Sequence, residues 1–200
     1  MSSIDVSFVL VGNDRPWAKK MVASVREHIP DARLIQMSDE ATDCIADEMI
    51  TRPYDGRMMT FRLDHLAAFP HKRMLILDDD CIVKGDVLGV FNSEFDVALT
   101  KRTEPATYEG CNITETCPYN TGVMFSRGGK FWKRAAEVCH RLPDRLQRWW
   151  GDQMAVAVTA QKGGFRVREL DTHYNWTPKE RDDTSDALIW HYKGTRKEWM

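Results

Sequence analysis

The chain has 200 residues, of which 42% are apolar and 29% are charged, a size and composition typical of a globular domain. Lysine and arginine total 28 and aspartate and glutamate total 30, so the net charge is −2. This balance argues against a general nucleic-acid binder. No apolar run approaches the roughly 20 residues that span a bilayer, so no transmembrane segment is expected.

The opening residues MSSIDVSFVLVGND lack the basic region of a signal peptide, so we expect a cytoplasmic protein. The sequence shows no convincing domain boundary, so we expect one domain over residues 1–200. The five cysteines are odd in number and scattered, which makes a poor disulfide framework. Cys111 and Cys117 are close together, but no second cysteine or histidine pair follows at the spacing of a zinc site. We therefore interpret the cysteines as ordinary thiols.

The first elements form a β-α-β unit. Residues 7–11 are a continuous apolar run, which is typical of a strand buried on both faces of a parallel sheet. A helix is predicted over residues 16–28, with Pro16 in its first turn and Asn13 or Asp14 as its cap. Residues 33–37 then read as the second strand.

The rest of the chain continues the alternation of helices and strands. A helix is predicted over residues 57–69, with Asp55 as candidate cap and Pro70 as its end. The other predicted elements are strands at 74–77, 96–100, 122–126, 165–170 and 187–192 and helices at 130–142 and 152–161. This order predicts an α/β sandwich with a mainly parallel sheet. The longest loop, residues 101–119, is expected to shape an acceptor site.

Three aspartates, Asp78, Asp79 and Asp80, directly follow the apolar strand 74–77. Alternate residues of a strand point to the same side, so Asp78 and Asp80 should face one another beyond its carboxyl end, with Asp79 turned away. Open α/β sheets bind ligands at that end. Two carboxylates there favour a hard divalent cation such as Mn²⁺ or Mg²⁺, although a solvated turn or helix cap has the same pattern.

Haloacid-dehalogenase-like phosphatases share this local pattern and would use Asp78 as a nucleophile. Asp182 and Asp183 resemble their distal acidic pair. However, those enzymes usually carry the motif on an early strand, whereas here it follows the third predicted strand or a later one. A second alternative is a nucleotide-sugar-binding protein without catalysis.

Five blocks follow one another in a characteristic order: Arg62-Leu63 with residues 72–88, Tyr119 to Met124, Trp150 to Gln153, Tyr174 to Trp176, and His191 to Trp199. Together they resemble the retaining GT-A glycosyltransferases of the glycogenin, galactinol synthase and lipopolysaccharide galactosyltransferase group. The resemblance implies a GT-A-type (nucleotide-diphospho-sugar transferase) three-layer sandwich. It also implies a hexosyltransferase that moves a sugar from a nucleotide sugar, UDP-sugar by family weight, to an unknown acceptor.

The resemblance assigns roles to particular residues. Asp78, Asp80 and His191 would hold the metal, and the mixed oxygen and nitrogen ligands suit Mn²⁺ better than Mg²⁺. Asp152, Gln153 and Lys197 would be catalytic, with Lys197 on the leaving diphosphate. The residues expected to contact the donor are Val11, Gly12, Asn13, Asp14, Arg62, Asp78, Asp79, Asn120, Gly122, Gly194 and Lys197.

Each of these residues also has a simpler interpretation. His191 resembles a buried core histidine, Lys197 a solvated lysine near the chain end, Arg62 a surface cation and Asp152 a helix cap. Tryptophans 149, 150, 176, 190 and 199 either stack on sugars or, more commonly, pack in the core.

Two departures from the family pattern affect the prediction. The first strand lacks the usual longer Ser/Thr-bearing stretch, and Glu198 stands where the family usually has proline.

Overall fold

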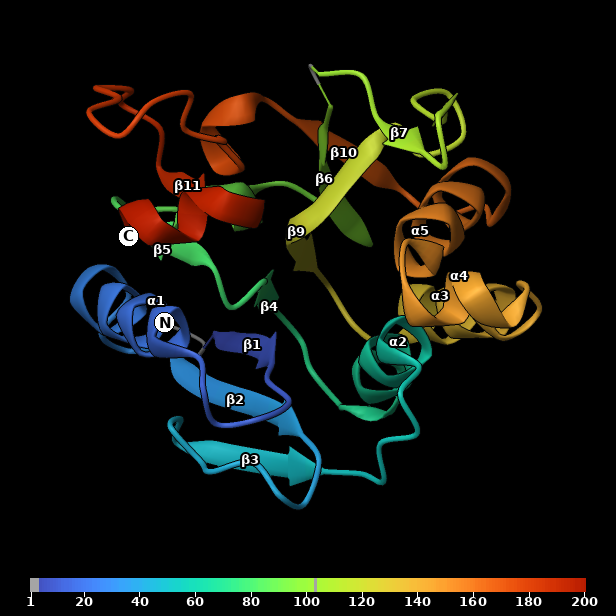
Figure 1. Ribbon diagram of the computed structural model, residues 1–200, viewed down its shortest axis with the longest axis horizontal. Helices are drawn as coiled ribbons and strands as arrows, with labels where there is room; N and C mark the ends of the chain where they lie inside the picture. Colours follow the sequence, from blue (N-terminus) through green and yellow to red (C-terminus); the bar gives the residue numbers. More distant parts are fainter. Residues whose placement is uncertain (1–3, 103) are drawn as a thin grey trace.

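The computed structural model describes residues 4–102 and 104–200, and it contains a seven-stranded central sheet with helices on both faces (Figure 1). The first three residues and Thr103, in the expected loop, lie outside the described residues. The strand order is β10 (Val167–Leu170), β6 (Val97–Lys101), β9 (Tyr119–Ser126), β4 (Met74–Leu77), β1 (Asp5–Val9), β2 (Arg33–Ser38) and β3 (Glu48–Thr51). Only β9 runs antiparallel to its neighbours, β4 and β6. The α/β sandwich with a mainly parallel sheet is confirmed.

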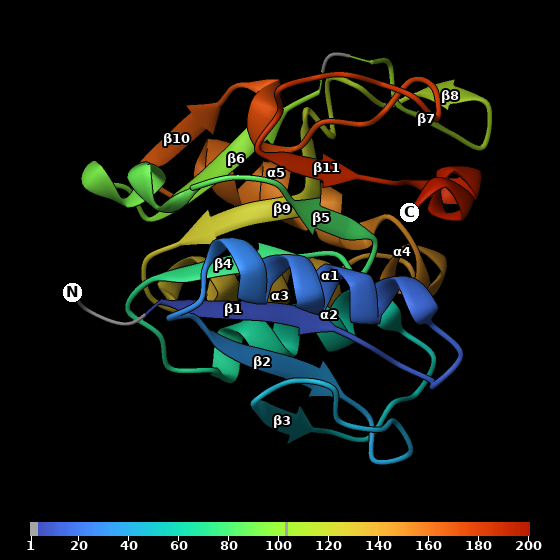
Figure 2. The ribbon, with the colours of Figure 1, turned by 90° about the vertical axis from the view of Figure 1, so that its left-hand side faces the viewer.

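Two helical layers cover the sheet. In Figure 1, α1 (Pro16–His28) lies on one side, together with a two-stranded sheet of β5 (Cys81–Val83) and β11 (Ile189–His191). The opposite layer is made of α2 (Met58–Ala68), α3 (Lys130–His140), α4 (Asp144–Arg148) and α5 (Gly151–Lys162). Figure 2 shows α1 and β5 in front of the sheet and the other helices behind it.

The central strands read as continuous apolar runs because both of their faces are buried. In β4, Leu75 and Leu77 pack into the core under α1, whereas Met74 and Ile76 pack into the core under α2 and α3. All four of these side chains are at most 2% exposed. Transfer of such side chains from water contributes about 1.5–3 kcal/mol each, so this strand is anchored on both sides. The anchoring fixes where β4 ends and the aspartates begin.

The predicted helix caps are wrong in detail. The residue at the start of α1 is Arg15, and no side chain caps that helix. Asn13 instead donates to the carbonyl oxygen of Ala41 and accepts from the backbone of Asp43. Asp55 accepts from the backbone nitrogen of Arg57, which lies at the start of α2 itself, so it is not a helix cap either. Both side chains hold loops in place.

Several short elements were not predicted. They are β3 at the sheet edge, α4, the hairpin of β7 (Thr107–Tyr108) and β8 (Cys111–Asn112) inside the expected loop, β5, and the 3-10 helices η1 (Leu88–Asn92), η2 (Thr172–Tyr174) and η3 (Gly194–Trp199). Each is too short to show a hydrophobic period. Within the described part of the chain, no helix combines the length and the apolar character needed to cross a membrane.

Candidate functional site

The acidic cluster lies where β4 ends and the chain turns into β5. The backbone nitrogen of Cys81 donates to the carbonyl oxygen of Asp78 (3.2 Å), which closes the turn. Strand β11 pairs antiparallel with β5, and His191 stands opposite Cys81 in the register. The backbone nitrogen of Tyr192 then donates to the carbonyl oxygen of Asp80 (2.9 Å). This pairing brings a histidine from the end of the chain onto the aspartates.

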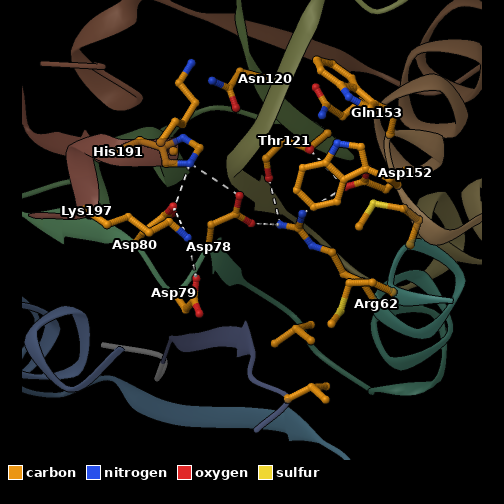
Figure 3. A pocket seen from close by; sticks show the side chains of 18 of the residues that line it. Arg62, Asp78, Asp79, Asp80, Asn120, Thr121, Asp152, Gln153, His191 and Lys197 are labelled. Carbon is orange, nitrogen blue, oxygen red and sulfur yellow. Dashed lines mark hydrogen bonds and ion pairs between the residues drawn. The ribbon is translucent and has the colours of Figure 1, made fainter. Parts of the chain in front are cut away.

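Two of the three carboxylates point toward this histidine (Figure 3). The Nε2 atom of His191 lies 3.5 Å from Oδ2 of Asp78 and 3.2 Å from Oδ1 of Asp80. Asp79 points elsewhere and contacts Arg15 (3.2 Å) and the indole nitrogen of Trp17 (3.1 Å). The alternation expected for residues 78–80 is therefore present in the geometry.

A chain of hydrogen bonds fixes the tautomer of His191. The side-chain amide of Asn175 donates through Nδ2 to the carbonyl oxygen of Asn120 (3.1 Å). Its Oδ1 must therefore face Nδ1 of His191 (3.0 Å), so that Nδ1 carries the proton. In the neutral ring, Nε2 then presents a lone pair to two carboxylates. Three electron-pair donors converge on one point.

This arrangement fits a divalent cation. Oδ1 of Asp80 is buried and, when the imidazole is neutral, has no hydrogen-bond partner among the described residues. An unpaired buried carboxylate oxygen is costly, and a cation would remove that cost. Sγ of Cys81 is also close, but burial raises the pKa of this thiol well above its usual range. The carboxylates and the imidazole are therefore the better ligands.

Arg62 of α2 is a buried cation on the other side of Asp78. Its guanidinium forms ion pairs with Asp78 (2.9 Å) and Asp152 (3.0 Å) and donates to the carbonyl oxygen of Thr121 (2.8 Å). Burial alone would lower the pKa of Arg62, but the two carboxylates outweigh burial and raise it. The guanidinium therefore stays charged and links α2, β4 and α5 at the site.

The three aspartates differ in their protonation tendencies. Burial raises the pKa of Asp78 despite Arg62 and His191, and burial together with Asp80 raises the pKa of Asp79. Burial acts in the same direction on Asp80, but His191 and Lys197 outweigh it and lower the pKa of Asp80. Asp80 is thus the carboxylate that the surroundings hold most firmly in its charged form.

Lys197 reaches the cluster from η3. Its Nζ lies 2.9 Å from Oδ2 of Asp80 and 3.9 Å from Oδ1 of Asp79 (Figure 3). Gly194, at the start of η3, has φ +63°, a left-handed conformation that glycine adopts without strain. The turn at Gly194 thus directs the 3-10 helix and its lysine back toward the aspartates.

A bulge in β9 supplies the backbone groups of the site. Leu99 of β6 pairs with Met124, but the next residue, Thr100, pairs with Asn120 instead of Val123. The extra residues leave the carbonyl groups of Asn120 and Thr121 for Asn175 and Arg62. The carbonyl group of Gly122 faces β4 and accepts from the backbone nitrogen of Asp78. Bulges commonly re-aim groups next to functional sites. Oδ1 of Asn120 accepts from the backbone of Gly122, which leaves its Nδ2 as a donor toward the pocket.

Asp152 and Gln153 begin α5 and face the same pocket. Oδ2 of Asp152 accepts from Arg62 and from the Thr121 hydroxyl (3.1 Å), whereas its Oδ1 is buried without a hydrogen-bond partner among the described residues. Asp152 therefore does not cap α5, whose preceding residue is Trp150 with φ +72°. Oε1 of Gln153 accepts from the Arg102 guanidinium.

These residues line a pocket of about 480 Å³. Of the predicted site residues, the lining includes Val11, Arg62, Asp78, Asp79, Asp80, Asn120, Asp152, Gln153, His191, Gly194 and Lys197. Gly122 lies directly beneath the ring of His191. Gly12, Asn13 and Asp14 lie outside the lining. The backbone of Gly12 is bound to Thr42 and the side chain of Asn13 to the loop at residues 41–43.

Other lining residues were not predicted. They include Val9, Arg15, Met58, Met59, Arg102, Thr121 and Lys193. Of the tryptophans, Trp149 lines the pocket with 64% of its surface exposed, whereas Trp190 is buried. Burial and repulsion by Arg102 and Arg196 lower the pKa of Lys193, outweighing attraction by Asp80 and Asp78. In the sequence, no local pattern distinguishes Arg15, Arg102 and Lys193 from ordinary surface cations.

Solved glycosyltransferases share this architecture. The galactosyltransferase LgtC superposes with a TM-score of 0.64 at 14% identity, over 96% of this chain and 87% of LgtC. A glycosyltransferase involved in glycosylation of the major capsid of PBCV-1 gives 0.67 at 17%, over 99% and 97%. GlyE of Streptococcus pneumoniae gives 0.69 at 14%, over 97% of this chain and 59% of GlyE. At these identities the similarity establishes the fold, which is the GT-A fold.

No protein-family model matches the chain, and no curated protein is similar to it in sequence.

Proposed function

We propose that the chain is a metal-dependent glycosyltransferase that moves a sugar from a nucleotide sugar, UDP-sugar in the first instance, to an acceptor hydroxyl. The observation that carries this proposal is the convergence of Asp78, Asp80 and His191 at the end of β4 within a GT-A fold. Lys197 adds a positive charge at the same place. A cation ligated by two carboxylates and an imidazole, beside a lysine, matches the needs of a nucleoside diphosphate.

Asp78, Asp80 and His191 would hold the cation, with Mn²⁺ favoured by the mixed ligand set. When bound, the ion supplies positive charge to the diphosphate as it leaves. Asn175 holds the imidazole with Nε2 toward the carboxylates. Lys197 donates from Nζ to diphosphate oxygens, because an ammonium has three protons and the contact with Asp80 uses one.

Asp152 is the residue best placed to bind the donor sugar. Its Oδ2 is held by Arg62 and Thr121, and the remaining buried oxygen, Oδ1, can accept from a sugar hydroxyl. Nδ2 of Asn120, in β9, can donate to the same sugar. Gln153, held by Arg102, lies beside Asp152 and would face the anomeric carbon. The exposed Trp149 provides a flat surface for a sugar ring.

We propose transfer with retention. The anomeric carbon loses its bond to the diphosphate oxygen while the acceptor hydroxyl approaches from the same face. The hydroxyl oxygen forms the new bond, and its proton passes to the departing diphosphate. Asp152 is already engaged by Arg62 through Oδ2, which makes it better suited to sugar binding than to proton removal from an acceptor. If the transfer instead inverted the anomeric configuration, Asp152 would be the base that removes the proton of the acceptor hydroxyl.

The phosphatase alternative has no structural support, because the chain has the fold of glycosyltransferases and its first carboxylate is paired with Arg62. The remaining alternative is a nucleotide-sugar-binding protein without turnover. It predicts binding of UDP and Mn²⁺ without release of UDP from any UDP-sugar.

The test is UDP release from UDP-glucose, UDP-galactose and their N-acetyl forms, with and without Mn²⁺. We expect Mn²⁺-dependent release that falls at least about 100-fold in Asp80→Asn and His191→Ala, since loss of a ligand removes the bound charge. Asp186→Asn changes an exposed residue and His28→Ala a half-buried one; both lie outside the pocket and serve as controls. Undiminished release in both site variants would disprove the assignment. Tight UDP binding without release would support the non-catalytic alternative.

A further inference from the structure

A second pocket of about 510 Å³ adjoins the proposed donor site. The two pockets share Arg102, Asn120 and Lys193 in their linings. Asn120 lies at the opposite end of the labelled site from Asp79 (Figure 3), so the second pocket begins away from the part of the site that faces β1. This is the place from which a second substrate could reach a sugar held at Asp152.

The second pocket is strongly basic. Its lining contains five cations, Lys101, Arg102, Lys179, Lys193 and Arg196, and one carboxylate, Glu104. Lys101 reaches Glu169 at 3.9 Å. For the other four, no carboxylate lies within ion-pair distance among residues 4–102 and 104–200. The chain as a whole has a net charge of −2, so this concentration of unpaired positive charge is local. Like charges at short range cost free energy unless an anion binds between them.

Three of these cations are held close to the boundary between the pockets. Arg102 is fixed by the carbonyl oxygen of Cys117 (3.0 Å) and by Gln153. Lys193 is half-buried, and Arg102 and Arg196 are the cations that repel it. Nε of Arg196 is buried without a hydrogen-bond partner among the described residues. A bound anion would give this nitrogen a partner and would offset the repulsion among the three cations.

We propose that this pocket binds the acceptor through a phosphate ester, so that the sugar is transferred to a small phosphorylated molecule. The inference rests on the proposed glycosyltransferase function. Arginine and lysine together are the usual ligands of a phosphate dianion. Lys197 and a cation held by the metal ligands would serve the donor diphosphate. Lys101, Lys179 and Arg196 line only the second pocket, so they are available to a second anion.

The size of the pocket favours a small acceptor over a polymer. A volume of about 510 Å³ is in the range of small-molecule sites. The indole ring of Trp176 lies in the lining and offers an apolar surface to the body of the acceptor. The ammonium of Lys179 lies 5.8 Å from the centre of this ring. The hydroxyl of such an acceptor forms the new bond to the anomeric carbon. The bond from that carbon to the diphosphate breaks, and the hydroxyl proton leaves with the diphosphate.

The first experiment measures equilibrium binding of inorganic phosphate, glucose 6-phosphate and glucose to the full chain by calorimetry, without donor. We expect glucose 6-phosphate to bind at least tenfold more tightly than glucose. Lys193→Met and Arg196→Gln should each weaken phosphate binding about tenfold, and Lys193→Arg should retain most of it. Lys162→Met removes an exposed cation outside the pocket and is the control. Absence of phosphate binding, or unchanged binding in Arg196→Gln, would overturn the proposal.

Two further outcomes are decisive. If Lys197→Met abolishes phosphate binding while Arg196→Gln, which changes a residue of the second pocket alone, does not, phosphate occupies the donor site and the proposal is wrong. If a single-stranded oligonucleotide binds more than tenfold more tightly than a mononucleotide, a polymer and not a small molecule is the acceptor, which contradicts the proposal. The binding measurements need no turnover. Phosphate binding without UDP release would therefore contradict the proposed function alone, and UDP release without phosphate binding would contradict only this inference.

Discussion

Gly122 and His191 show how a single residue shapes the site. A Cβ atom on Gly122 would lie 2.0 Å from Cε1 and 2.3 Å from Nδ1 of His191. Real Cβ atoms do not approach other atoms so closely, so any larger residue at 122 must displace the imidazole. The displaced ring would lose its hydrogen bond to Asn175 and its position over Asp80. Glycine at 122 is therefore required for the proposed metal ligands to meet.

We expect Gly122→Ala to weaken Mn²⁺ binding at least tenfold, because disturbed ligand orientation commonly costs 10–100-fold in metal affinity. Titration of Mn²⁺ followed by electron paramagnetic resonance measures the change. Gly89→Ala is the matched control, since a Cβ at Gly89 meets nothing within 4 Å. In a His191→Ala background, Gly122→Ala should have no further effect. A full additional loss in the double variant would mean that the clash with His191 is not the cause.

At the scale of elements, the site depends on short segments that join distant parts of the chain. Strand β11 has only three residues, yet its register with β5 places His191 beside Asp80. The 3-10 helix η3 follows directly and carries Lys197 to the same carboxylate. The turn between them is made by Gly194 with φ +63°. The geometry of this turn therefore controls the position of Lys197.

Gly194→Ala tests this role. The left-handed backbone costs an L-residue roughly 1–2 kcal/mol, and a Cβ at Gly194 meets no atom within 4 Å, so the expected effect is backbone strain alone. Gly164→Ala imposes the same kind of strain at φ +69°, also without a neighbour within 4 Å, outside the pocket. Urea unfolding should show similar destabilisation in both variants, whereas UDP binding should weaken only in Gly194→Ala. Equal UDP affinity in the two variants would contradict a role for this turn in the site.

At the scale of the whole molecule, the stability of the fold is linked to pH through a buried histidine. His65 of α2 is 1% exposed, and neither ring nitrogen has a hydrogen-bond partner among the described residues. Burial, aided by Arg52, lowers the pKa of His65 from 6.5 to about 4. In the unfolded chain, His65 therefore binds a proton below about pH 6.5, whereas in the folded chain it binds a proton only below about pH 4. Stability is fully present above pH 6.5 and is lost as the pH falls through this window.

We expect the free energy of unfolding to fall by about 3 kcal/mol between pH 6.5 and pH 4 on account of His65, given about 1.4 kcal/mol for each unit of pKa difference. In His65→Leu this component should disappear, so the pH profile of urea unfolding flattens in that window. His28→Gln replaces a half-buried histidine of α1 and should leave the native profile in place. A profile for His65→Leu that parallels the native one would show that another group causes acid unfolding.

Much of the architecture follows from local sequence patterns. Helix α1 has the predicted bounds, β4 lies where its apolar run predicts it, and α3 begins where its apolar period predicts it. The patterns were sufficient because burial of one helix face leaves a repeat of 3.6 residues, and burial of both strand faces leaves a continuous apolar run. They were insufficient for β3 and α4, whose few residues contain too little of any repeat. The helix caps at Asn13 and Asp55 were wrong because loops compete for the same side chains.

The sequence by itself determined that Asp78 and Asp80 stand on one side of a strand end, because that relation depends only on residues two apart. Only the tertiary structure decided that His191 meets them, because the register of β11 on β5 joins residues 110 positions apart. It also decided that Arg62 is buried between two carboxylates. The clustering of Arg102, Lys193 and Arg196 is likewise tertiary. Local periodicity carries no information about such contacts, because strand register and the packing of layers set the distances between residues that are far apart in the chain.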